Sequence, residues 1–133
     1  MAAEIVDLVQ ETLGEAKKPA PTDTIELPGA DRAKDIARLQ NDDPTLADPL
    51  VEGLPYTGAH LVYGVTNEMA MDLSDLLIRR AHLAFETRDH GKSTAPRAAD
   101  IVAPVLGWDD LTKRTRIREF EQDIARIFAI SDA

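Results

Sequence analysis

The amino-acid sequence predicts an all-α fold, a small bundle of about four to six helices. Apolar residues recur at helical spacing along most of the 133-residue chain, and no stretch shows the alternation of a β-strand. Residues typical of helix caps, aspartate before the apolar stretches and glycine after them, mark the ends of several elements. No internal repeat is visible, so the length indicates one domain, alone or with a short appendage.

The N-terminal appendage, residues 1–14, is expected to be an amphipathic helix closed by Gly14 at the C′ position. Acidic residues occupy its other side, and its apolar side consists of Ile5, Leu8, Val9 and Leu13. Residues 15–30 contain Pro19, Pro21 and Pro28, a composition typical of an extended linker. The remainder, residues 31–133, is expected to form one helical domain.

The first half of this domain should contain two helices separated by turns. Asp31 is a candidate N-cap for a short helix that stops before the turn-rich NDDP segment. Residues 44–56 carry three prolines and are expected to form turns with short helical pieces. A second helix starts near Thr57, and its apolar face is expected to hold Leu61, Val62, Val65 and Met69.

Three further helices are expected after this point. Asp72 is the N-cap candidate of a helix that runs to about Phe85. Ser93 or Thr94 is expected to cap the next helix, which starts at APR and ends at Gly107, with Pro96 in its first turn and a kink at Pro104. Asp109 should cap the last helix. The apolar stripe of that helix consists of Ile117, Phe120, Ile124, Ile127 and Phe128.

The composition argues against several classes of function. The formal net charge of −9 disfavours a nucleic-acid partner, because phosphate neutralisation needs clustered Lys and Arg. Cysteine is absent, which removes disulfides, thiol catalysis and zinc–thiolate sites and fits a reducing, cytoplasmic environment. No apolar run is long enough to span a membrane and no signal-peptide pattern opens the sequence, so we expect neither feature.

The usual signatures of catalysis are also missing. The seven glycines form neither GxGxxG nor GxxxxGK[ST], so no dinucleotide or phosphate loop is expected. His60, His82 and His90 lie far apart, without the spacing of a metal site. The basic run at residues 113–118 spreads around its helix, which favours a solvated surface over a lipid-binding face. Trp108 precedes a helix cap, so we favour a hydrophobic staple over ligand stacking.

Two adjacent arginines close the stretch NEMAMDLSDLLIRR, and helical spacing separates them. Arg80 falls within the apolar arc of its helix, whereas Arg79 falls on the polar side beside Asp75 and His82. A buried guanidinium stays charged and needs a carboxylate or carbonyl partner. We expect Glu68, just across the turn, to pair with Arg80 and lock two helices together. The alternative is that one of the arginines faces another domain or a ligand.

These residues carry a resemblance to a known family. The stretch from NEMAMDLSDLLIRR onward, followed by APRAADIVAPVLGW and a last amphipathic helix, resembles the C-terminal helical cap domain of FAD-dependent glycerol-3-phosphate dehydrogenase. GLPY at residues 53–56, LPGA at residues 27–30 and the first helix are similar to family segments too. The sequence departs from the family pattern in one place, because no RYG-type stretch precedes the helix that leads into EMA at residues 68–70.

The resemblance implies that this chain acts as a non-catalytic part of a larger enzyme. The parent enzyme would oxidise sn-glycerol 3-phosphate to dihydroxyacetone phosphate on FAD and reduce quinone, whereas this chain would carry no catalytic, cofactor-binding or metal site. Its partner would be the flavin-binding domain of the same enzyme, with homo-oligomers and membrane association as properties of the full-length cytoplasmic or peripheral protein. Structural or docking roles then fall to Glu68, Arg79, Arg80 and Trp108. The alternatives are a stand-alone helical interaction module and, less favoured, a small autonomous enzyme.

Overall fold

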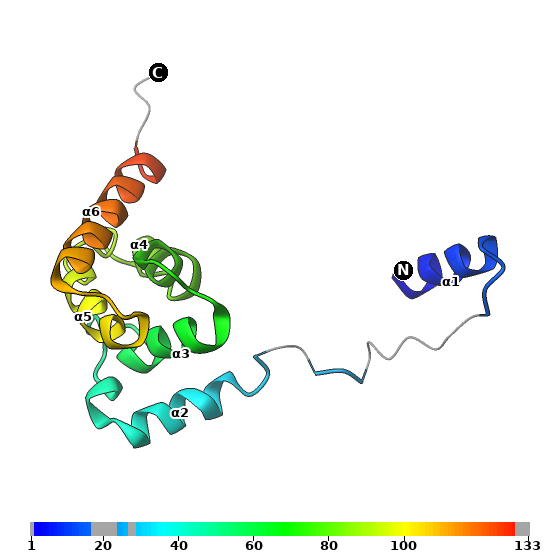
Figure 1. Cartoon of the computed structure of the whole chain (residues 1–133), viewed down its shortest axis with the longest axis horizontal. Coiled ribbons are helices and arrows are strands. Elements are labelled where there is room, and N and C mark those ends of the chain that lie inside the picture. Colours follow the sequence, from blue (N-terminus) through cyan, green and yellow to red (C-terminus); the bar gives the residue numbers. More distant parts are fainter. Residues whose placement is uncertain (1, 17–23, 27–28, 130–133) are drawn as a thin grey trace. The chain divides into compact units, whose positions relative to one another are not determined.

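The computed structural model describes residues 2–16, 24–26 and 29–129. Regular structure within these residues is helical, apart from one isolated antiparallel bridge between Pro49 and Thr57, so the all-α prediction is confirmed (Figure 1). The chain divides into two compact units, Met1–Asp31 and Arg32–Ala133.

The first unit contains the helix α1, Ala2–Thr12. The amide of Gly14, whose φ is +71°, donates to Glu11 O at 3.1 Å and ends the helical stretch, as the sequence predicted. The apolar side chains of α1 are solvent-exposed, with Ile5 and Leu8 each at 63% of their full accessible area. The three prolines expected in the linker lie outside the described residues.

The second unit is a helical bundle in which α5 contacts both α3 and α6, while α2 contacts α3 (Figure 1). A short 3₁₀-helix, η2, and a π-helix, η3, interrupt the series of α-helices. In chain order the elements are α2 (Arg32–Asp42), η2 (Pro44–Ala47), α3 (Gly58–Glu68), η3 (Asp75–Arg80), α4 (Leu83–Glu86), α5 (Ala95–Leu106) and α6 (Asp110–Ile127).

The core of this bundle is aliphatic, with one aromatic ring at its centre. A smaller cluster of Ile36, Ala59 and Tyr63 joins α2 to α3. On α6, Phe120 and Ile124 are buried as the predicted stripe requires, whereas Ile127 is 46% exposed. The largest fully buried side chains of the main core are Leu61, Leu73, Leu76, Leu77, Leu83, Val102, Phe120 and Ile124.

The single helix expected from Asp72 to Phe85 is wrong in its middle. Asp72 does cap the start, since its Oδ1 accepts the Asp75 amide at 2.7 Å. The chain then widens into the π-helix η3, where the Ala81 amide reaches five residues back to Leu76 O at 2.9 Å. His82 takes a left-handed conformation, with φ +53°, and separates η3 from the short helix α4.

The predicted caps agree with the structure in part. Asp109 accepts the Thr112 amide at 2.7 Å, and Gly107 ends α5 with φ +68°, so both predictions are confirmed. Thr94 occupies the N-cap position of α5, but its side chain makes no capping bond there. Met69 is not on the apolar face of α3: it lies beyond the end of the helix in a left-handed conformation and is 83% exposed.

Candidate functional site

A polar joint lies where η3 meets the end of α3. Arg80 Nε lies 3.5 Å from Glu68 Oε2, and Arg80 Nη2 donates to the Glu68 backbone carbonyl at 2.5 Å. The pair predicted from the sequence is therefore present, with a second contact that the sequence did not suggest. The carbonyl at the end of a helix has no partner within the helix, so this donor satisfies a group that needs one.

The joint is less deeply buried than helical spacing suggested. The side chain of Arg80 keeps 24% of its accessible area and that of Glu68 keeps 26%. A regular α-helix would carry residue 80 into the apolar arc. Arg80 instead ends the π-helix η3, to which regular α-helical spacing does not apply, and its side chain is only partly buried.

Glu68 also forms an ion pair with a second arginine, which the sequence did not predict. Arg32, at the start of α2, places Nη1 3.6 Å from Glu68 Oε1 and holds its guanidinium 5.7 Å from the ring centroid of Tyr63. One carboxylate therefore faces guanidinium groups from α2 and η3 at once. No sequence motif indicates this contact, because residues 32 and 68 are joined only by the packing of α2 on α3.

Asp75 accepts hydrogen bonds from both arginines and from the loop that follows α3. Its Oδ1 accepts from Arg79 Nη1 at 2.8 Å, and its Oδ2 accepts the Met71 amide at 3.1 Å. Arg80 Nη1 donates to the Asp75 backbone carbonyl at 3.3 Å. The Arg79 side chain is 59% exposed, so it lies on the surface beside Asp75, where helical spacing put it.

Trp108 lies apart from this joint, at the junction of α5 and α6. It is partly buried against the main core, and the Arg116 guanidinium lies 5.8 Å from its ring centroid. A hydrophobic staple would need an apolar residue at the fourth position of α6, but that position is Lys113. Trp108 therefore packs on the core without a regular staple.

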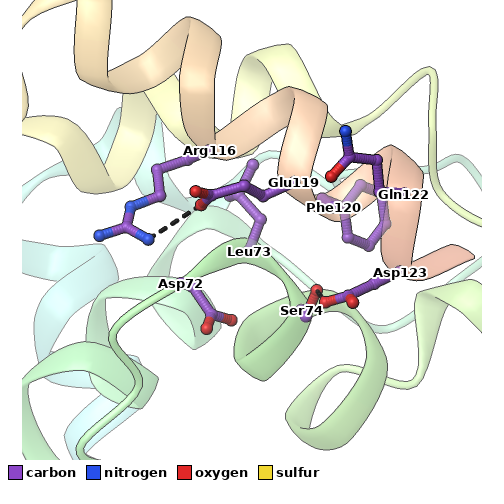
Figure 2. Close-up of a pocket in the computed structure, with 8 residues that line it drawn as sticks. All are labelled: Asp72, Leu73, Ser74, Arg116, Glu119, Phe120, Gln122 and Asp123. Carbon is purple, nitrogen blue, oxygen red and sulfur yellow. Dashed lines mark hydrogen bonds and ion pairs between the residues drawn. The ribbon is translucent and has the colours of Figure 1, made fainter.

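A polar pocket of about 280 Å³ lies between residues 72–74 and α6 (Figure 2). Ser74 Oγ donates to Asp123 Oδ2 at 2.7 Å, and Arg116 Nη1 pairs with Glu119 Oε2 at 2.9 Å. The hydroxyl of Ser74 thus contacts a carboxylate, and no histidine lines the pocket. The Ser74–Asp123 hydrogen bond joins the start of the η3 segment to α6, whereas the Arg116–Glu119 pair lies within α6.

Two general features bear on the kinds of site this chain can form. No group of three or more His, Asp or Glu side chains in the described residues is arranged to hold a metal ion. No helix in the described part combines the length and apolar character needed to cross a bilayer. The fold and its polar joint thus define a small helical domain whose charged residues connect helices to one another.

The chain resembles known proteins over most of this domain. Residues 29–114 match the family model described as the C-terminal domain of alpha-glycerophosphate oxidase. The chain is 34% identical over 88 residues to a probable mitochondrial glycerol-3-phosphate dehydrogenase of Dictyostelium discoideum, a match that covers 66% of this chain and 14% of the relative. It is also 39% identical over 74 residues to a glycerol-3-phosphate dehydrogenase of Mycobacterium leprae, covering 56% of this chain and 13% of the relative.

A third relative extends the match slightly. Glycerol-3-phosphate dehydrogenase 2 of Mycobacterium tuberculosis is 34% identical over 95 residues, covering 71% of this chain and 16% of the relative. No solved structure matches the chain. The chain spans less than a fifth of the length of these relatives. It belongs to the family of the C-terminal domain of alpha-glycerophosphate oxidase, and the resemblance noted in the sequence is confirmed.

Proposed function

We propose that this chain is the accessory C-terminal part of an FAD-dependent glycerol-3-phosphate dehydrogenase, and that it caps and stabilises the flavin-binding part of that enzyme. The parent enzyme would oxidise sn-glycerol 3-phosphate to dihydroxyacetone phosphate and pass the electrons to quinone. The observation that carries this proposal is the match of residues 29–114 to the model of a C-terminal domain. The relatives of the chain are named as glycerol-3-phosphate dehydrogenases, which agrees with it.

The described residues do not fit a flavin site of their own. An FAD pyrophosphate is commonly held by a glycine-rich turn between a strand and a helix. The part of the chain that the structure describes has no strand, and the N-caps of α3 and α6 are Thr57 and Asp109. The FAD would therefore be bound by the preceding part of the enzyme, and this chain would contribute stability and contacts.

We also propose a separate role for each segment of the chain. We assign residues 1–14 to the end of the flavin-binding domain, residues 15–30 to a linker and residues 31–133 to the cap domain. The exposed apolar side of α1 supports the first assignment, because an amphipathic helix is stabilised mainly by packing its apolar face. The family match also begins at residue 29, after α1.

Within the cap domain, Arg80 and Glu68 would act as a brace, while Arg79 and Trp108 are the candidates for contacts with the flavin-binding part. Membrane association, on the inner face of the cytoplasmic membrane, would be a property of the full-length enzyme, as would homo-oligomer formation. No nucleic-acid partner is proposed, given the acidic charge.

The proposal is tested first by the coding sequence upstream of residue 1. A continuous reading frame with a GxGxxG flavin-binding region that ends in a TTYR-like stretch is the expected result. Its absence would overturn the proposal and leave a stand-alone interaction module. The second test is an assay of the purified 133-residue chain with sn-glycerol 3-phosphate and an artificial electron acceptor. Turnover by the isolated chain would contradict the accessory role.

A further inference from the structure

The loop between α3 and η3 exposes two methionines in a segment that is otherwise held firmly. Met69 is 83% exposed and Met71 is 64% exposed, whereas Ala70 between them is completely buried. The Ala70 amide donates to Gly64 O at 3.0 Å and so ties the middle of the loop to α3. The loop therefore presents two apolar side chains to solvent from a fixed base.

The joint described above fixes both ends of this loop. Arg80 Nη2 holds the Glu68 carbonyl on one side of it, and Asp75 Oδ2 accepts the Met71 amide on the other. A surface whose backbone is already ordered loses little conformational entropy when a partner binds. Met side chains also adapt well to apolar surfaces of irregular shape.

Met69 occupies its position at a conformational cost. Its φ and ψ are +57° and +32°, in the left-handed region where a side chain with a Cβ is disfavoured. Glycine is the usual residue at such a helix end, and Gly107 has that place after α5. A large, exposed apolar residue at this point improves neither the backbone conformation nor the core. Neither the backbone conformation nor packing in the core therefore explains a methionine at this position.

Other unusual backbone features lie close to this loop. A π-helix follows the loop directly, and π-helical turns are frequent at functional sites. His82, which follows the π-helix, is another non-glycine residue with positive φ, and His90 is the third among the described residues. Unfavourable backbone conformations tend to cluster where a protein binds or acts.

We infer that Met69 and Met71 form a docking surface for the flavin-binding part of the parent enzyme. This inference rests on the proposed function and names the contact surface for it. The relatives support this choice of occupant. More than four fifths of their length lies outside the match, and the family model describes a C-terminal domain, so in those relatives a much larger polypeptide precedes the matched region. To bury the two methionines, that polypeptide needs an apolar patch facing them. Arg79 would then lie at the polar rim of the interface.

The test is a binding titration of the full 133-residue chain against the flavin-binding polypeptide encoded upstream. Met69→Asn is the informative variant, since asparagine tolerates the left-handed conformation but removes the apolar side chain. We expect the variant chain to be as stable to urea as the original or more so, while its Kd rises by about tenfold. Met71→Gln should weaken binding in the same direction. Leu111→Gln, at a 65% exposed position on α6, is the matched control and should leave the Kd unchanged.

The outcomes separate this inference from the proposed function. Binding by the original chain that survives both methionine substitutions would overturn the docking surface and leave the proposed function intact. No binding by the original chain would overturn both. A concentration-dependent dimer of the 133-residue chain that Met69→Asn abolishes would assign the surface to a second copy and overturn the inference. Protection of Met69 and Met71 from peroxide oxidation in the complex, read by mass spectrometry, would support it independently.

Discussion

Arg80 joins two helices by holding both the side chain and the backbone of Glu68. Its Nη2 donates to the Glu68 carbonyl, and its Nε lies 3.5 Å from the Glu68 carboxylate. The positive charge thus lies at the C-terminal end of α3, where the helix dipole is negative. The contact fixes the direction in which the chain leaves α3 and enters the loop between α3 and η3.

Glu68→Gln should lower the free energy of unfolding by about 1 kcal/mol, as expected for loss of a partly exposed ion pair. The loss is modest because Arg80 keeps its bonds to the Glu68 and Asp75 carbonyls. Urea unfolding measures it, with Arg79→Gln as the control, which should change stability by less than about 0.5 kcal/mol. An unchanged urea midpoint for Glu68→Gln would show that the carboxylate contributes nothing.

Gly64→Ala should destabilise the bundle despite a better helix propensity. A Cβ at Gly64 would lie 2.9 Å from Cδ2 of Leu76, which is fully buried. Overpacking costs about 1–3 kcal/mol, against a gain of about 0.5–1 kcal/mol from replacing a mid-helix glycine. The same substitution in a Leu76→Val background should cost less. An equal cost in both backgrounds would rule out this contact as the cause.

Stability should decrease in mild acid because of His60. Its Nδ1 accepts the Thr57 amide at 3.1 Å, and burial, followed by the charge of Arg32, lowers the pKa of His60 below its ordinary value of 6.5. Since the unfolded chain then binds the proton more readily, this contribution is complete above pH 6.5 and falls as the pH drops below it. Urea unfolding at pH 7 and pH 5 should show a steeper loss in the original chain than in His60→Gln. Parallel losses would contradict the assignment.

Amide hydrogen exchange should distinguish α1 from the bundle. An isolated helix of 11 residues is marginally stable in water, and the apolar side chains of α1 are exposed. We expect its amides to exchange on a much faster timescale than those of α5 in the 133-residue chain. Addition of the flavin-binding polypeptide should slow exchange in α1. Protection of α1 equal to that of α5 in the isolated chain would contradict its assignment to the preceding domain.

Local sequence rules predicted the ends of helices better than the geometry between them. Asp109 and Gly107 were predictable because a capping oxygen or a left-handed glycine acts on its own backbone. The Arg80–Glu68 pair was predictable because a guanidinium on the apolar side of its helix needs an acidic partner, and Glu68 ends the helix before it. The π-helix was not, because helical spacing assumes a regular α-helix and nothing in DLLIRR marks the wider turn.

The contacts that depend on packing were also missed. Arg32 meets Glu68 only after α2 has packed on α3, and the pocket of Figure 2 exists only where residues 72–74 face α6. Met69 was placed on the apolar face of α3 because its spacing fits. The helix ends one residue too early for that face to include it.

The position of Glu68 between Arg32 and Arg80 makes those two arginines thermodynamically dependent on each other, although no bond joins them. Loss of either one leaves the carboxylate compensated by the other. Loss of both would leave a partly buried negative charge without a counter-ion, so the double change should cost more than the two single changes together. The ion pairing of Glu68 is thereby redundant: after a single substitution in α2 or η3, the arginine of the other helix still compensates its charge.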